Sequence, residues 1–80
     1  MRFQLYTRAV LAEDLPKEGL RRGDVVTLVD YVVAPDGTEG YAIEVFNALG
    51  ETIAVTCVAE SALEPLRANE VLSVRQLAAA

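Results

Sequence analysis

The sequence predicts a mainly β protein, built as one small antiparallel barrel. Three observations lead to this fold class. Five apolar stretches alternate with turn signals, and their side chains largely follow the period of two that is typical of strands. The spacing leaves no room for the helices of βαβ units, and 80 residues suffice for one domain only. We therefore expect a barrel over residues 1–66, followed by a C-terminal tail over residues 67–80.

The first strand is expected over residues 2–11, where apolar and polar side chains alternate until the pattern slips near Thr7. A turn is expected next, over residues 15–20. Pro16 suits its first corner, and Gly19 can adopt the positive φ that ends it. The apolar residues at the two ends of this turn are expected to point inward.

Three strands are expected to follow as a meander. The first, over residues 24–33, is rich in Val, and its length predicts a bent or bulged strand that is shared by two sheets. The other two cover residues 41–46 and 52–58 and are joined by a short hairpin loop. Alternation is clearest in the last of them, which contains the single cysteine, Cys57. We expect this thiol to be buried as a small hydrophobe.

The end of the barrel is expected to contain a 3₁₀ turn over residues 60–63 and a closing strand over residues 64–66, with Pro65 at a sheet edge. Residues 69–80 are expected to form a short C-terminal helix with Asn69 as its N-cap. This order of elements is that of an SH3-like barrel.

Spaced motifs also resemble a family of small, uncharacterised prokaryotic proteins. Residues 11–24 carry an acidic-Leu-Pro, Gly-Leu and basic-Gly-Asp pattern. Residues 41–46 and 52–56 are similar to the central strands of that family, and residues 62–66 to its closing segment. The resemblance covers about residues 3–66. It implies an SH3-like barrel with no established activity, so it carries over no catalytic residues.

Composition excludes several kinds of functional site. The chain has no His and a single Cys, so it cannot form a His–Cys zinc site, an internal disulfide or a serine-type triad with His. Its carboxylates lack the spacing of a metal-binding loop. We expect a protein that is not an enzyme and has no catalytic residues, cofactor or metal. No apolar run is long enough to span a membrane and no signal peptide is recognisable, so we expect a cytoplasmic protein.

The charge is unevenly distributed along the chain. The formal net charge is −5, yet residues 23–66 contain eight acidic residues and no Lys or Arg. One interpretation is a solvated face that keeps a small barrel soluble. The functional interpretation is a surface that attracts a basic protein partner. The candidate partner-binding residues are Asp30, Glu39, Glu44 and Glu51.

The C-terminal tail carries four large apolar side chains within seven positions. A short isolated helix is marginal in water, so these side chains must pack on something. Packing on the tail's own barrel and packing on a second copy of the chain both remain open. The candidate self-association residues are Val71, Leu72, Val74 and Leu77.

These observations favour a non-enzymatic protein-interaction module that binds a protein partner or a second copy of itself. An alternative is an accessory protein, similar in role to an antitoxin, that binds a basic partner enzyme through the acidic segment. A nucleic-acid-binding barrel is disfavoured by the net negative charge. That role would require the convergence of Arg2, Arg8, Arg21 and Arg22.

Overall fold

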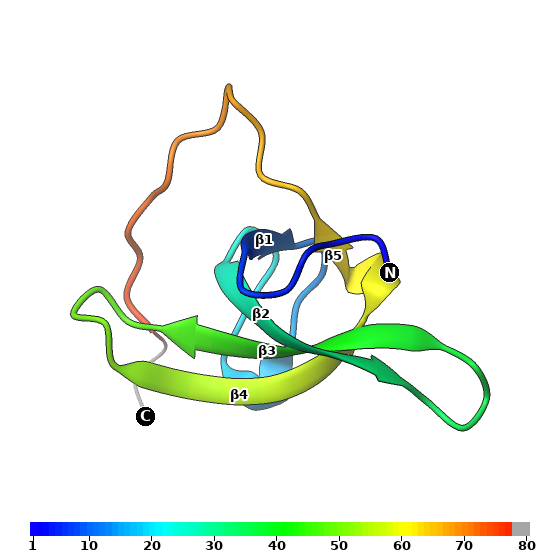
Figure 1. Cartoon of the computed structure of the whole chain (residues 1–80). Helices are drawn as coiled ribbons and strands as arrows, with labels where there is room; N and C mark the ends of the chain where they lie inside the picture. Colours follow the sequence, from blue (N-terminus) through cyan, green and yellow to red (C-terminus); the bar gives the residue numbers. More distant parts are fainter. Residues whose placement is uncertain (78–80) are drawn as a thin grey trace.

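The computed structural model describes residues 1–77 of the chain, and it has five antiparallel strands in one sheet (Figure 1). The strands are β1 (Arg8–Leu11), β2 (Val25–Val33), β3 (Glu39–Phe46), β4 (Thr52–Ala59) and β5 (Leu63–Glu64). Two 3₁₀ turns complete the elements, η1 (Pro16–Glu18) and η2 (Glu60–Ala62). The mainly β class is confirmed, as is the 3₁₀ turn before the last strand.

The sheet is open rather than closed by hydrogen bonds. Its strand order is β4-β3-β2-β1-β5, and within residues 1–77 no ladder joins β4 to β5. The expected closure of a barrel is therefore not seen in the hydrogen bonding. The long central strand β2 pairs with β1 and with β3, and its register shifts between Leu28 and Asp30. Such a shift bends a strand, as the length of this stretch predicts.

The hydrophobic core lies on one face of the sheet, called the inner face here. Residues that lie directly opposite each other on paired strands point to the same face. Leu28 faces Ile43 in this way, and Tyr41 faces Val58. All four side chains are buried. The largest fully buried side chains are Tyr41, Leu11, Leu28, Ile43, Leu63 and Val26.

The turn between β1 and β2 forms as the sequence predicts. Leu15 and Leu20 make an isolated antiparallel bridge at its base, and Leu20 is buried in the core. η1 begins at Pro16, and Gly19 ends it with a φ of 70°. The backbone N–H of Gly19 donates to the carbonyl of Pro16, which closes the turn.

The first strand is shorter than expected, because β1 begins only at Arg8. Tyr6 has a φ of 63°, a left-handed conformation that is uncommon for residues other than glycine. Its N–H donates to the carbonyl of Leu28, and the N–H of Leu28 donates to the carbonyl of Thr7. The chain therefore turns at Tyr6, close to the predicted slip, and residues 1–7 form an irregular N-terminal segment.

The prediction of a C-terminal helix is wrong over residues 69–77, because these residues contain no helix. The tail instead leaves β5, turns at residues 67–70 and returns to the sheet as an extended segment (Figure 1). Val71 and Val74 are β-branched, which lowers helix propensity, and a helix this short gains little from its own hydrogen bonds. Residues 78–80 of the expected helix lie outside the described residues.

The prediction that Cys57 is buried is also wrong, because its thiol is exposed. Alternation in β4 allowed either set of side chains to face the core. The pairing of Tyr41 with Val58 places the Val58 side chain inward. Cys57 and Val55 therefore point to the opposite face, called the outer face here, and Val55 is 61% exposed.

Candidate functional site

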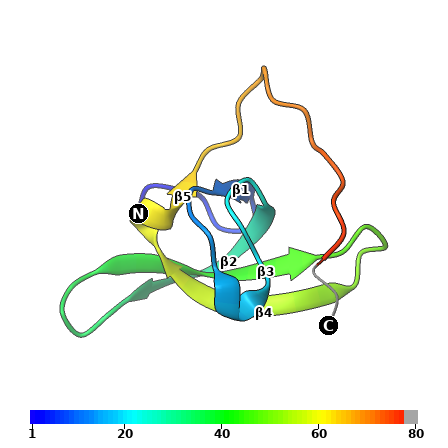
Figure 2. The ribbon, with the colours of Figure 1, turned by 180° about the vertical axis from the view of Figure 1, so that it is seen from behind.

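A cleft of about 1070 Å³ lies between the sheet and the C-terminal tail. Val10 and Val25 contribute to its floor from the outer face, where they are directly paired across β1 and β2. The β3–β4 hairpin borders one side with residues 46–49, and the tail borders another with residues 70–77. The views from the front and from behind agree that the tail stands off the sheet (Figures 1 and 2).

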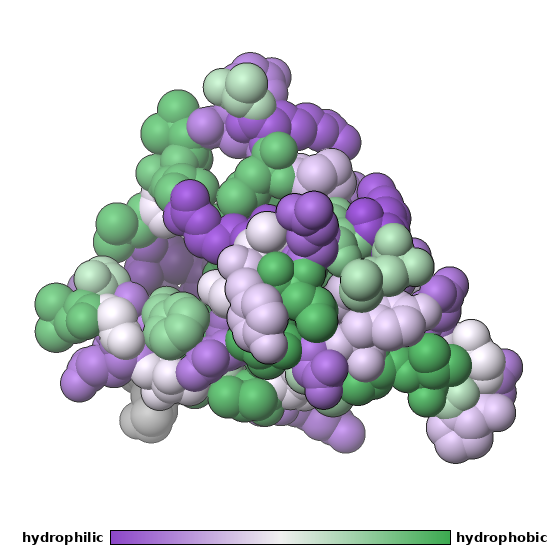
Figure 3. Space-filling model, viewed as in Figure 1, coloured by the Kyte–Doolittle hydropathy of each residue, from purple (hydrophilic) through white to green (hydrophobic). Residues whose placement is uncertain are grey.

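The cleft is largely apolar, and many of its side chains are left in contact with solvent. Figure 3 shows hydrophobic side chains along the tail and a hollow beside it. On the hairpin side, Leu49 is 86% exposed and Phe46 is 43% exposed. On the tail side, Leu72 is 55% exposed and Leu77 is 47% exposed. Contiguous exposed apolar groups of this kind mark interaction sites in soluble proteins.

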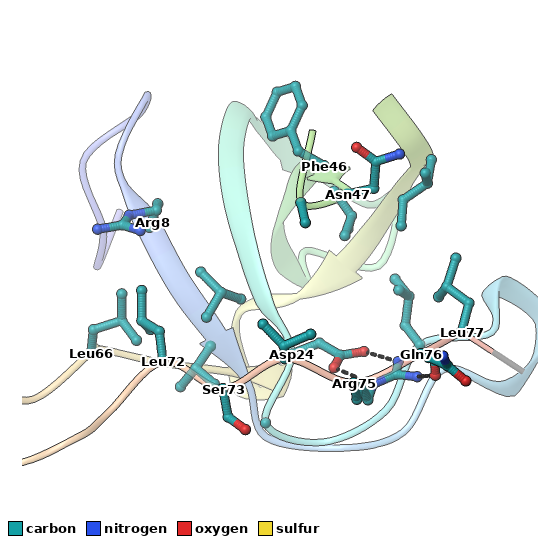
Figure 4. A pocket seen from close by; sticks show the side chains of 18 of the residues that line it. Arg8, Asp24, Phe46, Asn47, Leu66, Leu72, Ser73, Arg75, Gln76 and Leu77 are labelled. Atoms are coloured by element: carbon teal, nitrogen blue, oxygen red, sulfur yellow. Dashed lines mark hydrogen bonds and ion pairs between the residues drawn. The ribbon is translucent and has the colours of Figure 1, made fainter. Parts of the chain in front are cut away.

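One charged contact attaches the far end of the tail to the domain. Arg75 donates to Asp24 through Nε to Oδ1 at 2.9 Å and through Nη2 to Oδ2 at 2.5 Å. Its Nη2 also donates to the carbonyl of Gly19 at 3.2 Å. Figure 4 shows this pair along the tail side of the cleft, between Leu72 on one side and Leu77 on the other. Within residues 1–77, no backbone hydrogen bond joins residues 71–77 to the sheet.

The surroundings of Asp24 stabilise its charged form. Partial burial acts to raise the pKa of this carboxyl. The hydrogen bonds from Arg75 and from the backbone N–H of Arg21 outweigh that effect and lower the pKa below its ordinary value. The same contact raises the pKa of Arg75. Both side chains therefore remain charged at neutral pH.

The four predicted partner-binding carboxylates do not form one cluster. Asp30 pairs with Ala42 on the outer face, and Glu44 lies two residues farther along β3 on the same face. Glu39 belongs to the inner-face set of β3 and accepts a hydrogen bond from the hydroxyl of Tyr31. Glu51 lies before β4 and accepts from the side-chain amide of Asn47. The structure thus brings only Asp30 and Glu44 together.

The acidic segment carries little internal neutralisation. Among residues 1–77, the ion pairs are those of Arg75 with Asp24 and of the Met1 amino group with Glu39, at 3.8 Å. Glu44 accepts a hydrogen bond from the Thr52 hydroxyl at 2.6 Å, which orients its carboxylate without neutralising the charge. The outer face around Asp30 is therefore negatively charged.

The predicted self-association residues lie along the extended tail, and all four line the cleft. Val71 and Val74 are the most exposed of them, at 91% and 89%. The tail thus returns to its own chain but leaves most of its apolar surface uncovered.

Of the four arginines that nucleic-acid binding would require, Arg2 has its side chain engaged locally, and Arg8 lines the cleft. Arg2 stacks its guanidinium on the ring of Phe3 and donates to the carbonyl of Leu63. The backbone N–H groups of Arg21 and Arg22 donate to carboxylates of neighbouring loop residues.

Sequence reasoning did not identify Asp24 and Arg75 as a pair, nor the hairpin residues that border the cleft. The two charged residues are 51 positions apart, so no local pattern links them. The available signal was that Arg75 is the one charged side chain in an otherwise apolar and polar stretch, residues 71–77. A lone charge there suggests a specific partner elsewhere in the fold.

In the part of the chain that the structure describes, no helix has the length and apolar character needed to cross a membrane. Within the same residues, no three His, Cys, Asp or Glu side chains lie close enough together to hold a metal ion.

The fold and the cleft define the class of the protein as a small, all-β domain with an exposed apolar cleft. A family model described as Domain of unknown function (DUF4926) matches residues 5–65. This match covers more than half of the chain, so the chain belongs to that family, and the expected membership of an uncharacterised family is confirmed. No curated protein and no solved structure matches the chain. Arg75 and the tail lie outside the family match.

Proposed function

We propose that the protein is a non-enzymatic protein-interaction module and that its cleft receives an apolar segment of a protein partner. The observation that carries this proposal is the apolar lining of the cleft, which stays exposed in the isolated chain. The exposed side chains on both sides would lose their contact with water when a partner binds. Burial of apolar area contributes roughly 25 cal/mol per Å² to such an association.

The attachment of the tail suits this role. Residues 71–77 are attached to the rest of the domain by the side chain of Arg75, without backbone hydrogen bonds to the sheet. A segment attached in this way can move outward to admit a chain and then cover it. Regions with few backbone hydrogen bonds and exposed side chains open at low free-energy cost.

A finer fold assignment belongs to the same proposal. We infer that the open sheet is an SH3-like barrel. The strand order, the bent β2 and the position of η2 between β4 and β5 support this assignment. Barrels of this type bind partners through surface grooves without chemistry of their own.

Photo-crosslinking tests the proposal. A photoreactive amino acid placed at Leu49 or at Leu72 is expected to capture the same partner protein in cells, through an apolar segment identified by mass spectrometry. The matched control is Val33, which is 58% exposed and lies away from the cleft. Equal capture from Val33, or attachment through a charged segment of the partner, would reject the cleft as the binding site.

A second candidate function rests on a different surface. The outer-face carboxylates of Asp30 and Glu44 lie in a segment with no Lys or Arg. These carboxylates would allow the protein to act as an accessory protein that binds a basic partner enzyme. With such a partner, the double variant Asp30→Asn, Glu44→Gln is expected to weaken binding at low salt, and rising salt is expected to weaken the wild-type complex. The double variant Asp36→Asn, Glu18→Gln, which removes two carboxylates from the β2–β3 hairpin and from η1, is the charge-matched control. Affinity that does not change with salt would reject this function.

A further inference from the structure

The two edges of the sheet differ in how well they are protected. β5 has only two residues, one of which is charged, and Pro65 follows directly. Short strands, charged side chains and prolines are the usual means of preventing a sheet edge from pairing with another chain. The β5 edge therefore carries the features of a protected edge.

The β4 edge carries none of these features. β4 has eight residues and contains no charged residue and no proline. Each of the other four strands contains at least one charged residue. Within residues 1–77, the backbone of β4 is hydrogen-bonded into a ladder on its β3 side only. Figure 1 shows β4 along the lower border of the sheet.

The side chains next to this edge favour pairing with an apolar strand. Val55 is 61% exposed near the centre of β4, and the side chain of Cys57 lies beside it on the same face. Val55 continues a row of outer-face residues that runs through Glu44 and Thr27. A further strand would extend this row and cover the Val55 side chain.

We propose that the β4 edge is a homodimer interface, in which β4 of one copy pairs antiparallel with β4 of a second copy. Two identical edges pair around a two-fold axis, so each copy offers the same uncharged strand. The acidic residues Glu51 and Glu60 flank the strand rather than interrupt it. The product is a continuous sheet of ten strands, and Ile53 is the one residue of β4 that also lines the cleft. This inference goes beyond the proposed binding of a partner in the cleft.

Electrostatics sets the salt dependence of this dimer. Each copy carries a net charge of −5, and antiparallel pairing brings the Glu51 end of one strand near the Glu60 end of the other. Like charges oppose association, and salt screens them over about 10 Å at 0.1 M. Dimerisation is therefore expected to strengthen as salt increases, opposite to the binding of a basic partner.

Size-exclusion chromatography with light scattering tests the interface on the full chain. At roughly 0.5 M salt and high protein concentration, wild type is expected to approach twice its chain mass of 8.6 kDa. Val55→Lys is expected to weaken dimerisation at least about tenfold, since lysine at the centre of an edge strand opposes pairing. Val33→Lys is the control, because Val33 is 58% exposed and lies at the end of β2. Cys57→Lys is a second variant in case Val55→Lys does not fold.

Two further measurements separate this interface from the alternatives. Amide hydrogens of β4 are expected to exchange more slowly in the wild-type dimer than in folded Val55→Lys. The full-length double variant Val71→Ser, Val74→Ser, at two exposed positions of the tail, is expected to dimerise like the wild type. A monomer under all conditions, a dimer in Val55→Lys, or a dimer lost in the tail variant would each overturn the proposal. The last of these results would assign self-association to the tail. Loss of cleft crosslinking leaves this result unchanged, so the two proposals fail separately.

Discussion

Arg75 and Asp24 show how a single side chain determines the path of a whole segment. The tail has no helix and makes no backbone hydrogen bond to the sheet, so the guanidinium contacts at Asp24 and Gly19 are its main polar attachment within the described residues. Partly exposed ion pairs contribute up to about 1 kcal/mol. This contribution is small compared with the stability of the whole fold. For the eleven residues 67–77, which have no other polar attachment of this kind, it is a large part of what holds them in place.

Arg75→Gln is therefore expected to release the tail while changing the free energy of unfolding by no more than about 1 kcal/mol. The measurement is limited trypsin digestion, in which cleavage after Arg67 is expected to accelerate. Arg22→Gln, a loop variant, should leave the cleavage rate at Arg67 unchanged. Equal rates in wild type and Arg75→Gln would show that the ion pair does not hold the tail.

The same contact predicts a pH dependence. Because the pKa of Asp24 is lowered in the folded protein, its contact stabilises the tail fully above the ordinary value of 3.8 and is lost as the pH falls through the lower, folded value. Attachment of the tail is expected to persist at pH 5 and to fail only in the acid range below about 3.8. NMR chemical shifts of the Arg75 side chain during an acid titration would report this transition. Release that is already complete at pH 5 would contradict it.

Gly40 shows a different constraint, that of close backbone approach. A Cβ at this position would lie 2.3 Å from the carbonyl oxygen of Val58, in the neighbouring strand. Gly40→Ala is expected to lower the free energy of unfolding by about 1–3 kcal/mol, because β3 and β4 would have to separate. Denaturant unfolding measures the change. Gly37→Asn is the control, since its Cβ would meet open space and asparagine tolerates the positive φ there.

At the scale of elements, the sequence predicted the structure correctly where a local pattern is compatible with one backbone conformation only. The turn at residues 15–20 has both its Pro and its Gly in the positions that the turn requires, and the Leu15–Leu20 bridge forms as expected. The length of β2 correctly predicted its bend. In these segments, backbone geometry and side-chain burial favour the same structure.

Prediction failed where contacts between distant segments decide the outcome. In β4 two alternations were possible, and the pairing of Tyr41 with Val58 selected the one that exposes Cys57. In the tail, the distant Asp24 holds an extended chain where local spacing favoured a helix. The predicted acidic set gathers only in part. Because β3 alternates, Glu39 and Glu44 point to opposite faces, and Glu51 lies outside the strands, before β4.

The N-terminal segment depends on Tyr41 in a testable way. The hydroxyl of Tyr41 accepts a hydrogen bond from the Phe3 N–H at 2.8 Å and donates to Glu60, and the two rings are edge to face. Tyr41→Phe is expected to lower the free energy of unfolding by about 1–3 kcal/mol and to loosen residues 1–7, because Phe3 loses its acceptor. Amide exchange of Phe3 measures the local effect. Tyr6→Phe, at a side chain that is 78% exposed, should change neither quantity.

At the scale of the whole molecule, the charge distribution and the sheet edge influence self-association in opposite directions. With the proposed β4 interface, the eight acidic residues of residues 23–66 would oppose pairing at neutral pH, whereas the uncharged β4 would allow it. In this proposal, the protein therefore combines a local tendency to associate with a global charge that limits association. Net charge is the quantity that an experiment can vary without altering the strand.

Lowering the pH towards the isoelectric point of about 4.5 is expected to promote pairing through β4, because the net charge falls towards zero. The average mass measured by light scattering at low salt should rise between pH 7 and pH 4.5. Val55→Lys should remain closer to the chain mass at both values, while Val33→Lys should follow the wild type. Asp24, with its lowered pKa, remains largely ionised at pH 4.5, so the tail stays attached throughout. An increase in mass that is equal in Val55→Lys would trace association to loss of charge alone, without a role for the β4 edge.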